Sequence, residues 1–297
     1  MNHPAPVFSL PAVEHSMVQT NGVYLHVASA GDAAAPPVIL LHGFPEFWYG
    51  WRHQIPALAA AGFRVLAPDQ RGYNLSEKPE ALSAYALDTL AADVIGLMDA
   101  AGRDRAALIG HDWGAAVAWW TALKYPERVE KLVILNVPHP AVMIDMLSKS
   151  RRQLLKSWYI GYFQIPRLPE WLLGLGNGYG LTNLMLAASG PHALNDADIA
   201  RYQAAWAQPG ALTAMLNWYR SLVQLRPVMP ADLRIRVPTR ILWGEKDIAL
   251  VPELADASAA LCDDVDIVRF PNASHFVQHD EPAAVNAAIL AFLGQGA

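Results

Sequence analysis

Short apolar runs and amphipathic segments alternate along the first half of the chain, and this pattern predicts a mostly parallel β-sheet with helices on both faces. Two alternating runs around Asn21-Gly22 predict a hairpin. Unbroken apolar runs then predict strands buried on both faces, and they read PPVILLHGFP, FRVLAPDQRG, AALIGHD and KLVILNVP. The segments between these runs predict helices over residues 51–61, 87–101 and 114–124.

The alternation stops between residues 138 and 230. This segment is rich in Trp, Tyr, Leu and Met, it contains several prolines, and its stretch GLGNGYGLTN predicts a loop. It has no run rich in valine and isoleucine, so we expect a helical insertion. Strands are predicted again in PTRILWGEKD and VDIVRFPNASH, followed by a helix over residues 282–293. We therefore expect a core of residues 1–137 and 231–297, with residues 138–230 inserted as a helical cap subdomain.

The composition agrees with one large domain of this kind. Of the 297 residues, 53% are hydrophobic and 16% are charged, which is enough apolar material for a sizeable core. The net charge of −5 argues against a nucleic-acid partner. The single cysteine, Cys262, excludes an internal disulfide and is typical of a reducing compartment. We see neither a signal-peptide pattern nor an apolar run of the roughly 18 residues that span a membrane, so we expect a cytoplasmic protein.

The stretch GHDWGA, residues 110–115, joins a predicted strand to a predicted helix. Its small residues stand two positions before Asp112 and two and three positions after it, a spacing typical of the sharp turn that carries the nucleophile in many hydrolases. Such a turn forces the central side chain out above the sheet. The backbone amide of Trp113 then lies at the start of the helix, where it faces negative charge. Taken alone, Asp112 could also be an ordinary helix-capping residue.

The motif His42-Gly43-Phe44 ends another predicted strand. In a hydrolase with this turn, the loop at that place supplies a second backbone donor to an oxyanion, which would be the amide of Phe44. We expect the side chains of His42 and His111 to be structural, hydrogen-bonded behind the site.

An acid and a histidine follow the last two predicted strands. Asp247 comes after TRILWGEK, and His275 comes after DIVRF and a short loop. Because the carboxyl ends of parallel strands meet at one edge of the sheet, we expect both side chains near Asp112, and the order nucleophile, acid, histidine fits. The acid could also follow the strand LVIL, but Asn136 stands there and carries no charge. The alternatives for the base are His139 and His279.

An aspartate at this turn dictates a particular chemistry. A carboxylate is already ionised at neutral pH, and it can attack a saturated carbon to leave an alkyl ester on Asp112. Water activated by His275, which Asp247 orients, would then hydrolyse the ester, while the Phe44 and Trp113 amides stabilise the oxyanion. The pattern predicts hydrolysis of an epoxide or of a carbon–halogen bond. An epoxide oxygen must receive a proton as the ring opens, and the tyrosines of SWYIGYFQIP and LNWYRSL are candidate donors.

The chain resembles the epoxide hydrolases of the α/β-hydrolase superfamily over nearly its whole length. The resemblance lies in HGFPEFWYGWRHQIPALAAAGFRVLAPDQRGYNLSEKP, GHDWGAAVAW, YFQIP, NWYR and NASHFVQHDEP. It implies an α/β fold with a mostly parallel eight-stranded sheet, helices on both faces and a helical cap inserted after the sixth strand. It also implies that Asp112 is the nucleophile, His275 the general base and Asp247 the orienting acid.

The same resemblance implies that two cap tyrosines hold the epoxide oxygen. They are Tyr159, before the Phe-Gln of YFQIP, and Tyr219, within NWYR; Tyr162 is the weaker match. We expect the substrate pocket to include Phe44, Trp113 and Phe276. The implied reaction converts a small apolar epoxide and water into a vicinal diol without a metal or an organic cofactor. The sequence leaves the oligomeric state open between a monomer and a homodimer.

Two other classes of protein remain as alternatives. Haloalkane and haloacid dehalogenases use the same aspartate, but haloalkane dehalogenases typically have Asn where this chain has Phe44, and fluoroacetate dehalogenases have arginines where it has Trp113 and Ala116. A non-catalytic ligand-binding protein with this fold would show a degraded triad, whereas all three members are present here.

Overall fold

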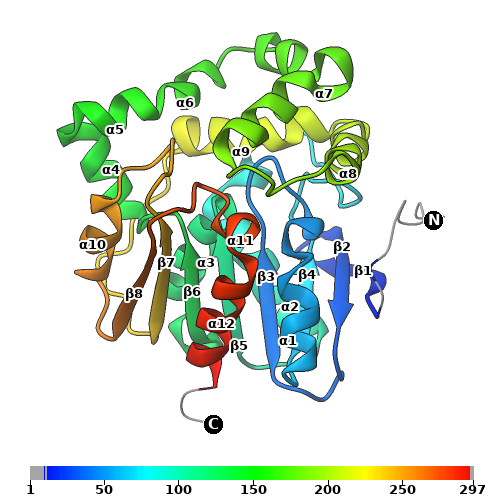
Figure 1. The fold of residues 1–297 in the computed structure, drawn as a ribbon, viewed down its shortest axis with the longest axis vertical. Coiled ribbons are helices and arrows are strands. Elements are labelled where there is room, and N and C mark those ends of the chain that lie inside the picture. Colours follow the sequence, from blue (N-terminus) through cyan, green and yellow to red (C-terminus); the bar gives the residue numbers. More distant parts are fainter. Residues whose placement is uncertain (1–9, 11, 295–297) are drawn as a thin grey trace.

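The structure, a computed structural model, describes residue 10 and residues 12–294. In this part of the chain one sheet runs through the middle of the molecule, in the strand order β1-β2-β4-β3-β5-β6-β7-β8 (Figure 1). Its strands are β1 (Glu14–Thr20), β2 (Val23–Ala30), β3 (Pro37–Leu41), β4 (Arg64–Pro68), β5 (Ala106–His111), β6 (Val129–Leu135), β7 (Thr239–Gly244) and β8 (Val265–Phe270).

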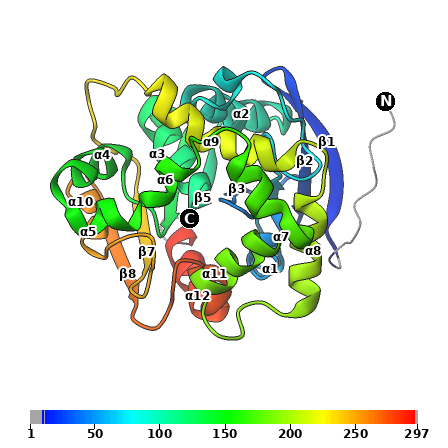
Figure 2. The same cartoon turned by 90° about the horizontal axis from the view of Figure 1, so that it is seen from above.

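The pairing of the strands explains their apolar sequences. β1 and β2 form the predicted hairpin across Asn21-Gly22, and both the β1–β2 and the β2–β4 pairs are antiparallel. From β4 to β8 every neighbouring pair is parallel. Helices cover both faces of the sheet, as Figure 2 shows. On one face α2 (Leu87–Ala100) contacts α3 (Trp113–Lys124), and on the other α12 (Pro282–Leu293) contacts α1 (Gln54–Ala60) and α11 (Val277–Asp280). The predicted fold class is thus confirmed.

The helix predicted over residues 51–61 is shorter than expected. Trp48–Trp51 forms a 3₁₀ turn, η1, and α1 begins only at Gln54. Pro56 explains the difference, because proline is accommodated in the first turn of a helix but not further along it. The remaining elements of the core are η2 (Leu82–Tyr85), η3 (Pro126–Arg128) and α10 (Glu253–Ala259).

The insertion between β6 and β7 is helical, as predicted. We call its members the cap helices: α4 (Pro140–Lys149), α5 (Arg151–Lys156), α6 (Trp158–Tyr162), α7 (Leu168–Ala188), α8 (Asp196–Trp206) and α9 (Ala211–Leu225). They lie across the carboxyl ends of the strands, at the top of Figure 1. Within the described residues, no helix has both the length and the apolar character that crossing a bilayer requires.

The prediction of a loop at GLGNGYGLTN is confirmed only for four of its residues. This stretch lies inside α7, where only residues 175–178 leave helical backbone angles. Three of those four residues have positive φ, which the two glycines among them tolerate, and the helix kinks there. Leu173 before the kink and Leu181 after it are buried. Packing of these apolar side chains therefore holds helix on both sides of a glycine-rich break.

Candidate active site

Asp112 occupies the sharp turn between β5 and α3. Its backbone angles, φ 48° and ψ −124°, are strained for a residue that carries a side chain. The two glycines of the turn permit the close approach of helix and strand. A Cβ on Gly110 would lie 2.6 Å from the Cα of Ala115, and a Cβ on Gly114 would overlap the carbonyl group of Leu41. The turn leaves the Asp112 side chain 16% exposed, so its carboxyl group is accessible to a small ligand.

One of the two predicted backbone donors contacts the Asp112 carboxyl group. The amide of Phe44 donates a hydrogen bond to Oδ1 of Asp112 at 2.6 Å. Trp113 is the first residue of α3, so its amide is among the N–H groups that have no carbonyl partner within the helix. Gly43 is required beside them, because a Cβ at this position would overlap the Asp112 side chain. The Phe44 amide is therefore in place to stabilise an oxyanion on this carboxyl group, and the Trp113 amide stays the predicted second donor.

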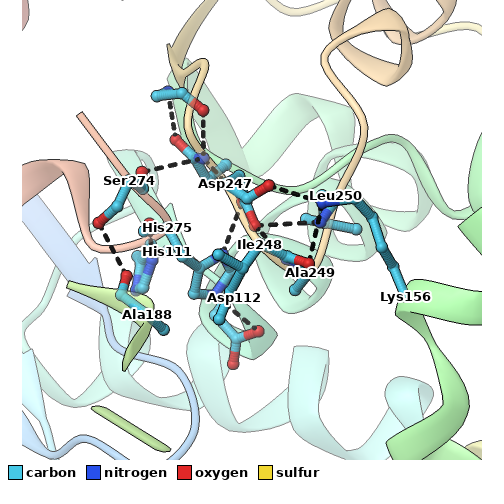
Figure 3. A network of polar contacts seen from close by, with 12 residues as sticks. His111, Asp112, Lys156, Ala188, Asp247, Ile248, Ala249, Leu250, Ser274 and His275 are labelled. Atoms are coloured by element: carbon cyan, nitrogen blue, oxygen red, sulfur yellow. Dashed lines mark hydrogen bonds and ion pairs between the residues drawn. The ribbon is translucent and has the colours of Figure 1, made fainter. Parts of the chain in front are cut away.

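Figure 3 shows that Asp112, His275 and Asp247 lie in one line of contacts. The Nε2 atom of His275 is 3.5 Å from Oδ2 of Asp112, and its Nδ1 atom is 2.7 Å from Oδ2 of Asp247. Asp247 follows β7 and His275 follows β8, so the parallel pairing of these strands brings the two loops together. The structure therefore places the three residues that the sequence identified within reach of one another.

Asp247 is held by a set of donors that the sequence did not reveal. Asn136 donates from Nδ2 to its Oδ2 at 2.8 Å, and the amides of Ala249 and Leu250 donate to its Oδ1 at 2.7 and 3.0 Å. These bonds satisfy a carboxylate that is almost completely buried. Asn136, which could not itself be the acid, thus orients the acid.

The charges of the site fix its protonation state. Burial raises the pKa of Asp112, but the hydrogen bond and the positive charge of His275 outweigh burial and bring this pKa below its ordinary value. The pKa of Asp247 is lowered in the same way, against burial, by the charge of His275. For His275, burial lowers the pKa, but the carboxylates of Asp247 and Asp112 raise it to about 10. At neutral pH the free site therefore holds two carboxylates and one imidazolium.

Two cap tyrosines lie together above this carboxylate. Tyr159 comes from α6 and Tyr219 from α9, and their ring centres are 5.9 Å apart. Burial raises the pKa values of both phenols, and the negative charge of Asp112 raises both further, so both hydroxyl groups stay protonated at neutral pH. The alternative, Tyr162, packs against Trp158, and the acid whose charge acts on its pKa is Glu170. The geometry therefore favours Tyr159 over Tyr162.

Aromatic rings surround the Tyr219 phenol. Phe44 and Trp113 lie with their ring centres 5.4 and 5.0 Å from that of Tyr219. Phe276 is fully buried and packs instead against the rings of three histidines, His111, His275 and His279. Phe44 and Trp113 therefore fit the predicted role as walls of a substrate pocket, whereas Phe276 supports the site from behind.

A buried acid, Glu46, lies behind the site and was not singled out by the sequence. It accepts hydrogen bonds from His279 at 2.6 Å, from Tyr202 of α8 at 2.9 Å and from His111 at 3.1 Å. His111 in turn lies 2.9 Å from the backbone carbonyl of His275. Glu46 thereby connects a cap helix with the backbone of the base. The only signal in the sequence is an acid directly after HGFP.

The other histidines have structural contacts. His42 lies behind the loop, where its Nε2 accepts a hydrogen bond from the amide of Gln70 at 3.0 Å. His139 is the N-terminal cap of α4 and accepts a bond from the amide of Ala141. His279 is engaged by Glu46 and by Arg52, whose NH1 is 2.9 Å from its Nδ1. These contacts leave His275 as the histidine that joins two carboxylates.

Comparison with known proteins assigns the chain to a protein family. Residues 36–282 match the sequence model of the family described as the alpha/beta hydrolase fold. The chain belongs to that family. It is 46% identical over 284 residues to AB hydrolase superfamily protein YfhM of Bacillus subtilis (strain 168), covering 96% of this chain and 99% of that protein.

Named epoxide hydrolases are similar over the same length. Epoxide hydrolase A of Mycobacterium tuberculosis (strain ATCC 25618 / H37Rv) is 37% identical over 311 residues, covering 93% of this chain and 96% of that protein. The crystal structure of the Bacillus megaterium epoxide hydrolase in complex with an inhibitor has a TM-score of 0.87 and 32% identity, covering 94% of this chain and all of that one. Within the α/β-hydrolase family, the chain groups with the proteins that are named epoxide hydrolases.

Proposed function

We propose that the chain hydrolyses a small apolar epoxide to a vicinal diol through a covalent ester on Asp112. The observation that carries this proposal is the continuous line of contacts from the Phe44 amide through Asp112 and His275 to Asp247. The nucleophile is ionised and both phenols are protonated, as the first step requires at its start.

In the first step, the Asp112 carboxylate attacks one ring carbon and the carbon–oxygen bond of the epoxide breaks. The ring oxygen takes a proton from Tyr159 or Tyr219, both of which stay protonated at neutral pH. The product is a hydroxyalkyl ester of Asp112. The aromatic rings of Phe44 and Trp113 beside Tyr219 suit an apolar substituent on the epoxide.

In the second step, water attacks the carbonyl carbon of the ester. Esterification removes the negative charge of Asp112, which is one of the two charges that hold the pKa of His275 high. His275 can then give up its proton, which restores the phenol that protonated the ring oxygen. The neutral imidazole acts as a general base that takes a proton from the attacking water, with Asp247 orienting its ring. The Phe44 amide and the Trp113 amide stabilise the oxyanion. When it collapses, the leaving alkoxide takes the proton that His275 removed from water, so that the diol and the Asp112 carboxylate are released and the protons balance.

Trapping the ester tests this scheme. His275→Gln removes the base but leaves Asp112 in place, so exposure to styrene oxide should add the mass of the epoxide to the peptide that contains Asp112. An unmodified peptide in a folded variant would contradict the scheme. Wild-type enzyme should give the diol from aryl and alkyl epoxides. Release of halide from haloalkanes or haloacetates, without diol formation from epoxides, would instead favour the dehalogenase alternative.

We further propose that residues 138–230 act as a cap subdomain, because this segment supplies both phenols to a site whose other members come from the core. We place the enzyme in the cytoplasm, since its single cysteine, Cys262, is free and buried. Fractionation of the native cells tests this location, and recovery of the enzyme outside the cytoplasmic membrane would contradict it.

A further inference from the structure

Exposed apolar side chains are concentrated on the cap helices. Apart from Ile248, the exposed large hydrophobic side chains of the described residues all lie between residues 144 and 228. On α5, α6 and the first half of α7 they form what we call the apolar cap face, represented by Leu154, Leu155, Trp158, Leu168, Trp171 and Leu175. Leu155, Trp158 and Trp171 are 75%, 67% and 62% exposed. A concentration of large apolar side chains on one part of a surface marks an interaction site.

The sequence of α7 shows why this face is not simply the outside of a packed helix. Leu168, Trp171 and Leu175 recur at the spacing of one helical stripe, and all three are exposed. Leu173, on the other side of the same helix, is buried. The outward stripe of a helix on a water-exposed surface is normally polar, so this helix is apolar on both its covered and its uncovered side.

The charges around the apolar cap face are predominantly positive. Over residues 151–175, which carry the face, the chain has four lysines and arginines but only one acid, Glu170, in a protein whose net charge is −5. One of the four, Arg152, lies 3.5 Å from Glu253 of α10. Glu170 is itself paired with Arg220 at 2.6 Å. Arg151 and Arg167 are exposed beside the apolar side chains. Tryptophan and leucine with a rim of arginine and lysine are the composition of a surface that lies in a membrane interface.

We propose that the apolar cap face docks the enzyme onto the surface of an anionic phospholipid bilayer. Trp158, Trp171 and the leucines enter the headgroup region, and the surrounding cations lie against the phosphates. Figure 1 shows α5, α6 and α7 at the end of the molecule that covers the carboxyl ends of the strands. Docking therefore turns the cap over Asp112 toward the bilayer, where apolar epoxides accumulate.

Charge favours a lipid surface over a second copy of the chain. Two copies that met through this face would bring Arg151, Arg167 and the other cations of both chains together, and like charges repel. An anionic bilayer offers the opposite charge. The positive charge of the apolar cap face therefore complements acidic phospholipid, whereas it would repel the same face of a second copy of the chain.

Sedimentation with large unilamellar vesicles tests the proposal. Wild-type enzyme should bind vesicles made of equal amounts of phosphatidylcholine and phosphatidylglycerol, bind pure phosphatidylcholine weakly, and be released by high salt. Leu155→Ser with Trp171→Ser should lower the partition coefficient by about tenfold or more, because two exposed apolar side chains no longer enter the lipid. Arg151→Gln with Arg167→Gln should lower it by about fivefold for each cation on the anionic vesicles only.

Matched controls lie elsewhere on the surface. Val228→Ser removes a side chain that is 79% exposed beyond the end of α9, and Arg236→Gln removes an exposed cation just before β7, at the opposite end of the strands from the cap helices. Neither should change binding. All variants should hydrolyse a water-soluble epoxide at the wild-type rate without vesicles, which shows that they are folded.

Three results would overturn the proposal. Wild-type enzyme that stays in the supernatant with both kinds of vesicle would exclude lipid docking. Variants of the apolar cap face that bind as tightly as the controls would assign the binding to another surface. Wild-type self-association in the ultracentrifuge that Leu155→Ser with Trp171→Ser abolishes would identify the face as a contact between copies of the chain.

Discussion

Replacing Asp112 with asparagine imitates the neutral ester that we propose on this residue, and we expect it to lower the pKa of His275. In the unmodified site Asp247 and Asp112 together raise this pKa to about 10. Asparagine tolerates positive φ better than most residues, so the turn should keep its shape. The perturbation therefore removes one negative charge beside His275 and changes little else.

The distance between the charges sets the size of the effect. The Nε2 atom of His275 is 3.5 Å from Oδ2 of Asp112, where two unit charges attract by roughly 5 kcal/mol at an effective dielectric constant of about 20. The Asp112 side chain is 16% exposed, so water screens part of this attraction. A shift of one unit in a pKa corresponds to about 1.36 kcal/mol of interaction energy between the two protonation states. We therefore expect the pKa of His275 to fall by about 1–3 pH units, which brings it toward neutrality.

Histidine ring signals in NMR spectra, followed from acid to alkaline pH, measure this pKa directly. The His275 signal is assigned by its loss in His275→Gln. Asp69→Asn is a matched control, since Asp69 is a buried carboxylate that pairs with His26 and not with His275. If the pKa of His275 is the same in Asp112→Asn as in the wild-type chain, esterification cannot be what releases the base, and our explanation of the second step is wrong.

Three further predictions follow from the same geometry. Asp112→Gly should abolish activity, yet it should be more stable to denaturant than the equally inactive Asp112→Ala by about 1–3 kcal/mol, because glycine relieves the positive φ of the turn; equal free energies of unfolding would refute this strain. Tyr159→Phe and Tyr219→Phe should each slow single-turnover alkylation by about 10- to 100-fold, and unchanged rates in both would reject them as proton donors. The ordinary pKa of histidine is 6.5 and that of folded His275 is about 10, so the unfolded chain loses this proton first as the pH rises. The free energy of unfolding should therefore decrease between these two values, and His275→Gln should flatten that decrease in urea titrations.

The periodicity of apolar residues predicted most of the fold, because buried parallel strands and amphipathic helices have different repeats. The final helix, α12, was predicted with the bounds that the structure has. The errors have local causes. Proline at position 56 delays the start of α1. Buried leucines on both sides of the glycine-rich break in α7 limit it to residues 175–178, where the composition predicts a longer loop.

Only some residues of the candidate site could be predicted from the sequence. Asp112, Asp247 and His275 were identifiable because each follows a predicted strand, and the carboxyl ends of parallel strands share one edge. Glu46 and Asn136 were not, since their importance lies in contacts with residues far away in the chain. The choice of Tyr159 over Tyr162 likewise rested on resemblance alone, because three residues along a short helix decide which phenol faces the carboxylate.

The most direct measurement is a single turnover of an epoxide by excess enzyme in water enriched in heavy oxygen. If water attacks the ester carbonyl, the label enters the Asp112 carboxylate and the first diol released carries none. Mass spectrometry of the peptide containing Asp112 and of the diol gives both values. A labelled diol with an unlabelled peptide would mean that water attacks the epoxide itself, and that no covalent ester forms on Asp112.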